Sequence, residues 1–518
     1  MPIPRPERAA RLLRLLLAAG LSVLPAALAA APRAAPPVSP APGTGTPTAG
    51  RAARSGAGRI PLDVTYRAAA ERLIGAALAS DHAYLRLSQL CDGIGHRLSG
   101  SPALERAVEW AAGAMRQDGL EQVRLQPVMV PHWVRGDEHA ELVEPGPQPL
   151  VILGLGGSVG TPPGGITAGV AAVSSFAELD SLPAEAVRGR IVLYDVPFTG
   201  YGETVRYRSQ GANRAAARGA VAALLRSVGP VSLRTPHTGV MDAYADSLPR
   251  IPAAAVTLED AAMMHRLLER GERVRVRLVM GAETRPDVLS HNVIGEIRGR
   301  ERPAEVVVVG GHLDSWDVGQ GAADDGGGCV ISMEALRLMK ALGLRPRRTV
   351  RCVLWLNEEN GLRGGLAYAD SLGGEVAHHV AAIEVDGGME SPLGFDVGVR
   401  RAAGDSLDVD RTAAAAARLR EIGRLLAGLG ADRVREGGGG ADIGPLMRRG
   451  VPGIGQRTSG EHYFDWHHSP ADMLDKVDPI ELRRNLAALA VLVYVLADMP
   501  EELTARVAGG RMTGRRHR

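Results

Sequence analysis

Cysteine, lysine and long apolar runs are scarce in this sequence, and each scarcity excludes a class of protein. The three cysteines among 518 residues are too few and too scattered for a disulfide scaffold or a thiolate zinc cluster. Only two lysines occur, Lys340 and Lys476, and neither follows a glycine as a phosphate-binding loop requires. No apolar run reaches about 18 residues, so no membrane span is predicted. The net charge of +2 argues against a nucleic-acid-binding protein with a broad basic surface.

Both ends of the chain differ in composition from its body. Four early arginines, an apolar run over residues 15–24 and small residues up to Ala31 predict a secretory signal peptide at 1–31. Residues 32–60 are rich in Pro, Ala and Gly and cannot bury enough apolar surface to fold, so we predict a disordered linker. Residues 501–518 form a basic tail. We therefore expect an exported protein, periplasmic or extracellular.

The body of the chain contains two regions that differ in their pattern of apolar residues. The runs Val306–Val309, Val350–Leu356 and Val380–Val385 are nearly all apolar, which is typical of strands buried on both faces. Helical stretches at 328–341 and 364–372 separate them, and this alternation predicts an α/β fold with a mostly parallel sheet covered on both faces. A final apolar run at 486–497 fits a helix packed on that sheet.

Between 131 and 284 the sequence changes to short strands interrupted by Gly and Pro. Strands are expected near 149–153, 189–196 and 274–280, and an Ala-rich helix near 213–227. We therefore predict one domain formed by 61–130 and 285–500, with a β-rich domain inserted at 131–284. A G-x-S-x-G pattern at 156–160 is followed by helix-breaking prolines, so it is interpreted as a loop rather than a nucleophile elbow.

Side chains able to bind a metal follow each of the three apolar strands. Because ligands of such sheets lie at the carboxyl ends of parallel strands, these side chains are expected to meet. Histidine and carboxylate donors without thiolates suit a catalytic zinc site. Taken in chain order, the candidates are His312, Asp314, Asp324, Asp325, Glu358, Glu359, Asp386, His467, His468 and Asp472. Asp314 and Asp472 are candidates to accept the second ring N–H of a ligating histidine.

These groups stand in motifs that resemble those of the co-catalytic zinc exopeptidases, and most closely the plasma glutamate carboxypeptidase, or carboxypeptidase Q, type. The resemblance covers about 62–500. It is carried by Gly311–Ser315, Ala323–Gly326, Asn357–Glu359, Val385–Asp386 and His468–Asp472, with Asp92–Pro102, Ser315–Gly319 and Tyr463–His468 in support.

The resemblance implies a fold, a metal pair and a reaction. The fold would be a three-layer sandwich, and the insert would be a protease-associated domain. Two zinc ions would be held by His312, Asp324, Glu359, Asp386 and His468, with Asp324 bridging both and with Asp314, Asp325 and Asp472 in support. Glu358 would be general base and acid for a metal-activated water that hydrolyses short peptides. Independently of the resemblance, Tyr463 and the Gly437–Gly440 loop are candidates to stabilise the oxyanion. Relatives suggest a homodimer.

Several alternatives stay open on the sequence alone. His467 is a second candidate for the role of His468, although the spacing to Asp472 favours His468. The chain could be a carboxypeptidase, a dipeptidase or an aminopeptidase. Two other functions remain: an inactive peptidase-fold binding protein, and a cyclase-like acyltransferase with one zinc. The full set of ligand candidates together with Glu358 favours an active enzyme.

Overall fold

The computed structural model describes residues 60–401 and 404–505. The predicted signal at 1–31, almost all of the predicted linker and most of the basic tail lie outside the described residues. Among the described residues, no helix combines the length and the apolar character that crossing a membrane requires.

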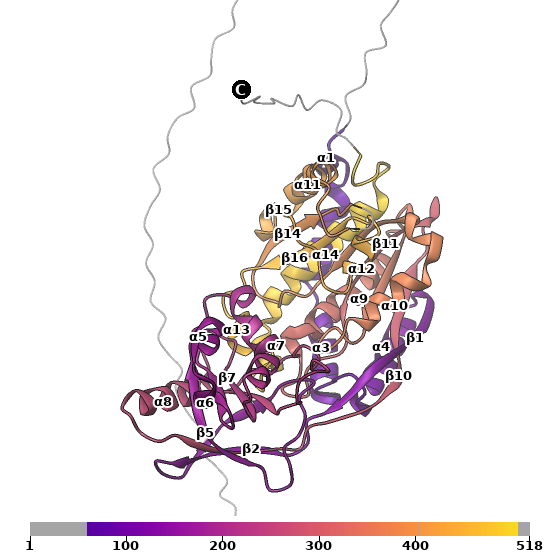
Figure 1. Cartoon of the computed structure of the whole chain (residues 1–518). Helices are drawn as coiled ribbons and strands as arrows, with labels where there is room; N and C mark the ends of the chain where they lie inside the picture. Colours follow the sequence, from indigo (N-terminus) through magenta and orange to yellow (C-terminus); the bar gives the residue numbers. More distant parts are fainter. Residues whose placement is uncertain (1–59, 402–403, 506–518) are drawn as a thin grey trace, which may run out of the picture. The chain divides into compact units, whose positions relative to one another are not determined.

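One mixed sheet of eight strands forms the larger part (Figure 1). In spatial order its strands are β1 (Glu121–Val134), β10 (Glu283–Ile297), β12 (Arg348–Trp355), β11 (Arg302–His312), β13 (His379–Glu384), β16 (Gly453–Thr458), β14 (Pro392–Gly398) and β15 (Arg433–Glu436). The four strands from β12 to β16 are parallel to one another, as predicted. Beside them, β10 and β14 pair in antiparallel fashion, so the sheet is mixed rather than mostly parallel.

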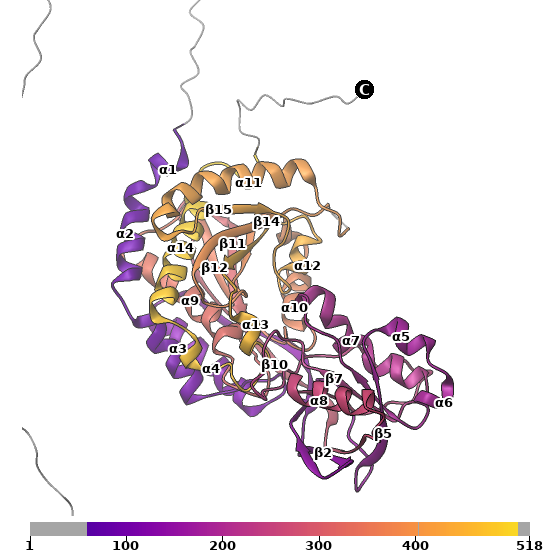
Figure 2. The same cartoon turned by 90° about the vertical axis from the view of Figure 1, so that its left-hand side faces the viewer.

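Helices cover both faces of this sheet, and alternate residues of each central strand pack against opposite layers. Val307 and Val309 of β11 pack in one apolar cluster with α9 and α14, whereas Val308 packs in another with α10 and α12 (Figure 2). Because both faces of β11 are buried, its central residues form a continuous apolar run in the sequence. The helices of this part are α1 (Leu62–Thr65), α2 (Arg67–Leu78), α3 (His82–Gly93), α4 (Pro102–Gln117), α9 (Gly327–Ala341), α10 (Arg363–Ser371), α11 (Val409–Gly423), α12 (Gly444–Met447), α13 (Tyr463–Trp466) and α14 (Pro479–Asp498).

A second sheet occupies residues 138–280, which we call the insert. Its strands in spatial order are β3 (Gln148–Leu150), β2 (Glu138–Glu144), β9 (Arg275–Met280), β5 (Ile166–Val173), β6 (Ile191–Tyr194), β7 (Ala222–Arg226), β8 (Ala253–Val256) and β4 (Ile152–Gly154). Its helices are α5 (Phe176–Ser181), α6 (Ala184–Val187), α7 (Tyr201–Ala217) and α8 (Leu258–Glu269). The paired strands β1 and β10 still belong to the first sheet, so the second sheet lies slightly inside the expected limits of 131 and 284.

The prediction of a helix near 213–227 is wrong beyond Ala217. The helix α7 ends at Ala217, and residues Ala222–Arg226 form the buried strand β7 instead. Gly219, at φ +82°, makes the turn between them, and two leucines and two alanines of β7 lie inside the sheet. Alanine favours helices, but burial between two strands outweighs that weak preference here.

Candidate metal centre

The carboxyl ends of three neighbouring parallel strands carry the predicted metal-binding side chains. His312 is the last residue of β11, Glu358 and Glu359 follow β12 after a short loop, and Asp386 follows β13. Since β11 lies between β12 and β13, these groups converge on one edge of the sheet, as the sequence predicted.

Asp324 lies in the middle of the cluster, and its two carboxylate oxygens face different partners. It stands in η1 (Ala322–Gly326), an irregular turn at the start of α9, and its peptide bond to Asp325 is cis. Its Oδ1 lies 3.1 Å from Nε2 of His312, and that nitrogen is 3.7 Å from Oδ1 of Asp386. Its Oδ2 lies 3.3 Å from Nε2 of His468, and that nitrogen is 3.0 Å from Oε2 of Glu359. One carboxylate therefore joins two sets of donors.

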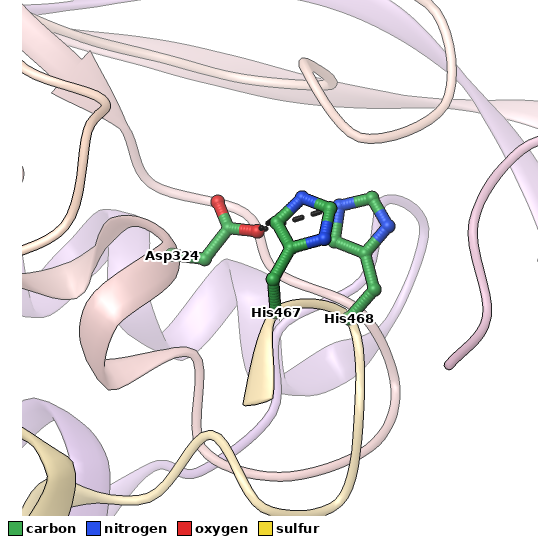
Figure 3. Close-up of side chains that lie close together, drawn as sticks. All are labelled: Asp324, His467 and His468. Carbon is green, nitrogen blue, oxygen red and sulfur yellow. Dashed lines mark ion pairs between the residues drawn. The ribbon is translucent and has the colours of Figure 1, made fainter. Parts of the chain in front are cut away.

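Both histidines of the loop after α13 point at Asp324 (Figure 3). Their rings stack with centroids 3.6 Å apart, and Nε2 of His467 lies 3.5 Å from Oδ2 of Asp324. His468 approaches two carboxylates, whereas His467 approaches one. The geometry favours His468 as the ligand but keeps His467 within reach of the same centre.

Charge in this cluster is arranged to favour a cation beside Asp324. Burial opposes the charge of His312, but the neighbouring carboxylates of Asp324 and Asp386 outweigh it and raise the pKa of His312 well above its usual value. The pKa of His468 is raised in the same way against burial, by Glu359 and Asp324. Burial acts against the ionised form of Asp324, yet its contacts with both histidines hold its pKa well below the usual range. A positive charge between these groups is thus stabilised.

Three carboxylate oxygens of the cluster are buried without a hydrogen bond. They are Oδ2 of Asp324, Oε2 of Glu359 and Oδ1 of Asp386. Each lies within 4 Å of a histidine Nε2, so the orphaned oxygens and the ring nitrogens face a common space. Buried polar atoms are rarely left without partners, and a bound cation is one way to satisfy them.

The carboxylates of Asp314 and Asp472 do not accept the ring N–H groups for which they were candidates. Nδ1 of His312 lies 2.9 Å from the backbone oxygen of Asp314, while the Asp314 carboxylate accepts the backbone N–H groups of Glu358 and Glu359. The Asp472 carboxylate accepts the N–H groups of Ala322, Ala323 and Asp324. Unpaired N–H groups of tight loops attract these carboxylates, so both fix the loops that carry the cluster.

Asp325 is fully buried and also bonds to the backbone. Its two oxygens accept the N–H groups of His312 and Gly328, at 3.1 and 3.0 Å. It thereby ties η1 to the end of β11, although its carboxylate also lies within ligand distance of His312 and Asp386.

Tyr463 and Glu358 border the cluster. The Tyr463 ring packs 5.1 Å from the His467 ring, and burial together with the charges of Asp324 and Asp386 raises its pKa, so its hydroxyl stays protonated. Glu358 is half-buried, and burial followed by the charges of Asp386 and Glu359 raises its pKa well above the usual value. A raised carboxyl pKa suits a group that takes up and returns a proton near neutral pH.

In the sequence, Arg97 stands out only as a member of the motif Asp92–Pro102. In the structure its side chain joins several loops around the metal centre. The side chain is fully buried, and its guanidinium donates to the backbone oxygens of Gly95, Leu313, Gln320 and Gly321. These oxygens belong to three loops, two of which flank His312 and Asp324. No spacing rule could have revealed a bond that joins such distant segments.

Replacing Arg97 by Met should destabilise the protein by about 3 kcal/mol or more, because several buried carbonyls lose their donor at once. Urea unfolding monitored by circular dichroism measures this change. Arg106→Met is the matched control on the exposed face of α4, where the change should stay within about 0.5 kcal/mol. Equal stability of the two variants would contradict the role given to Arg97.

Comparison with known proteins finds a family and close relatives. Residues 292–493 match Peptidase family M28. Carboxypeptidase Q of Mus musculus is 45% identical over 441 residues, which cover 85% of this chain and 91% of that protein. Carboxypeptidase Q of Homo sapiens is 45% identical over 425 residues, covering 82% of this chain and 87% of that protein.

Solved structures agree with this result. The crystal structure of a Peptidase M28 precursor from Shewanella amazonensis matches with a TM-score of 0.80 at 35% identity, covering 85% of this chain and 98% of that one. The zinc aminopeptidase BSAP of Bacillus subtilis matches with a TM-score of 0.59 at 22% identity, covering 82% of this chain and 96% of that one, which shows a shared fold. The likeness therefore extends over most of the chain.

Proposed function

Because this chain belongs to peptidase family M28, a family of zinc exopeptidases, we propose that it hydrolyses short peptides with a pair of zinc ions. The observation that carries the proposal is the division of the Asp324 carboxylate between two sets of donors, one with His312 and Asp386 and one with His468 and Glu359. A carboxylate that faces two sets in this way suits a bridge between two ions.

The residues present fit zinc. The cluster offers imidazole nitrogens and carboxylate oxygens, the donors that zinc takes in catalytic sites, and three of these oxygens are buried without a hydrogen bond. Cys329, the cysteine nearest in sequence to Asp324, donates its S–H to the backbone oxygen of His312 and does not join the cluster. The proposed ligands are His312, Asp324, Glu359, Asp386 and His468.

The chain's own residues then have distinct tasks in the reaction. Zinc, when bound, supplies Lewis acidity that polarises the scissile carbonyl and makes water nucleophilic at neutral pH. Glu358 takes the proton of the attacking water and passes it to the nitrogen of the leaving amine. Tyr463, protonated beside the carboxylates, donates a hydrogen bond to the oxyanion that forms. Asp314, Asp325 and Asp472 hold the loops that carry these groups.

Three further parts of the proposal concern the whole protein. The insert would be a protease-associated domain, since its sheet interrupts the peptidase fold between β1 and β10. The chain would be exported, which rests on the signal predicted at 1–31. It would act as a homodimer, as the resemblance suggests.

Metal analysis and a substrate panel test the function. We expect two zinc ions per chain, loss of hydrolysis by at least about 100-fold after removal of zinc with a chelator, and recovery on adding zinc back. The panel contains free dipeptides, N-blocked dipeptides and aminoacyl anilides. Cleavage of free dipeptides alone indicates a dipeptidase, of blocked dipeptides a carboxypeptidase, and of anilides an aminopeptidase. One ion per chain would support the cyclase-like alternative, and zinc binding without any hydrolysis would support the inactive binding protein.

A further inference from the structure

The insert contacts the turn that carries His468. The backbone N–H of Thr238 donates to the backbone oxygen of His468 at 2.8 Å. Nδ1 of His237 lies 2.7 Å from the backbone oxygen of His467 and donates to it, because a carbonyl can only accept. Two consecutive residues of the insert thus hold two consecutive carbonyls of the turn.

The residues that hold this turn are themselves fixed to the sheet of the insert. The N–H of His237 donates to the hydroxyl of Ser227, which in turn donates to the backbone oxygen of Val256 at the end of β8. The hydroxyl of Thr238 donates to the backbone oxygen of Gly154 at the end of β4. All of these side chains are buried, so the contact is built on strands rather than on a free loop.

The turn at His468 needs such support. His468 has a φ of +58°, a left-handed conformation that costs a residue with a side chain about 1 kcal/mol or more. An unfavourable backbone conformation persists only where surrounding contacts determine it. The bond from Thr238 to the carbonyl of His468 is such a contact.

The ring of His237 is buried beside the turn. Burial lowers the pKa of His237 to about 4, so the ring is neutral. Because a carbonyl oxygen can only accept, the contact between Nδ1 and the backbone oxygen of His467 places the ring proton on Nδ1.

A third contact from the insert does not carry the inference. Nη1 of Arg208 lies 3.3 Å from Nδ1 of His468 and also donates to the backbone oxygen of Thr238. An arginine can only donate, whereas a neutral imidazole that binds a metal through Nε2 keeps its proton on Nδ1. The backbone contacts of His237 and Thr238 do not depend on which ring nitrogen carries the proton.

We propose that the insert is a working part of the metal centre, in which His237 and Thr238 are positioning residues that hold the His467–His468 turn so that Nε2 of His468 faces Asp324 and Glu359. The inference rests on the proposed function. Figure 1 shows the insert helix α7 beside α13, and the stacked rings of Tyr201 and Phe464 join these helices directly before the turn. The insert would thus set the zinc affinity of one half of the centre, beyond any effect on substrate access.

The test is stepwise zinc binding to the full chain, measured by competition with a chromophoric chelator. In His237→Ala we expect one zinc ion to bind about 10- to 100-fold more weakly, as when other supporting groups around metal ligands are removed, while the second ion keeps its affinity. His237→Asn places an amide N–H near the position of Nδ1 and should restore most of the affinity. The visible spectrum of the cobalt-loaded His237→Ala protein should also change at one site.

The matched control is His265→Ala, because His265 also lies in the insert and its Nδ1 bonds to Asp195 there. It should leave both zinc affinities unchanged. The inference is overturned if His237→Ala binds both ions as the wild type does, or if His237→Asn is as impaired as His237→Ala, or if both affinities fall together with the melting temperature. If the wild-type chain itself binds no zinc, the proposed function fails first, and the two failures are therefore distinguishable.

Discussion

Glu358→Gln should lower kcat by about 10³- to 10⁴-fold and leave both zinc ions in place. Glutamine has nearly the same shape as glutamate but cannot accept a proton from the attacking water. Glu358 lies on the loop after β12, half-buried beside Glu359, and burial together with the charges of Asp386 and Glu359 raises its pKa. Steady-state kinetics on the best substrate of the panel, with zinc content from atomic absorption on the same sample, measures both quantities.

The neighbouring glutamate provides the contrast. Glu359→Gln should lose zinc as well as activity, since Oε2 of Glu359 lies 3.0 Å from Nε2 of His468 and faces the cluster. If Glu358→Gln retained full activity, the mechanism would be wrong. If it lost zinc in the same way as Glu359→Gln, Glu358 would be a ligand rather than the base.

The sequence predicted the parts of this centre that follow from local rules. His312 ends one apolar strand, Glu359 and Asp386 follow shortly after two others, and parallel strands bring their carboxyl ends to one edge. Asp324 and His468 lie on irregular segments, η1 and the turn after α13, and no periodicity places such segments. Their assignment depended on the resemblance to a family.

Contacts between distant segments could not be predicted from the sequence. The carboxylates of Asp314 and Asp472 turned to backbone N–H groups rather than to the histidines, because loop geometry decides which donors are left without partners. The same reason hides His237, whose bond to His467 joins residues 230 positions apart. Whether a histidine is buried depends on the folded chain, and no pattern in the sequence around His237 predicts its burial.

The antiparallel strand β10 beside the central strands was missed for a different reason. The strand β10 is buried only in its second half, part of which pairs with β12, while its first half pairs only with β1 and is mostly exposed. A strand that is half-buried in this way lacks the continuous apolar run that revealed β11 and β12. The prediction therefore held for the parallel centre of the sheet and missed β10, whose first half is exposed to solvent.

Asp324→Asn should remove the zinc pair and lower the activity by about 10³-fold or more, which corresponds to a loss of about 4 kcal/mol in transition-state stabilisation. The amide keeps one oxygen but replaces the other by an N–H₂ group, which cannot bind a cation. Since Oδ1 faces His312 and Oδ2 faces His468, one set of donors loses its carboxylate whichever way the amide is turned. We expect fewer than two zinc ions per chain at zinc concentrations that saturate the wild type, measured by metal analysis after dialysis.

Asp325→Asn is the matched control, because it changes the adjacent, equally buried carboxylate. Asp325 bonds to the backbone N–H groups of His312 and Gly328, and an asparagine can still accept one of these bonds. The control should therefore lose stability, since one buried N–H loses its acceptor, but keep both zinc ions at saturating zinc. The reversed outcome would be two ions in Asp324→Asn and loss of zinc in Asp325→Asn. It would make Asp325 the ligand between His312 and Asp386. The bridging carboxylate on which the dinuclear proposal depends would then be absent.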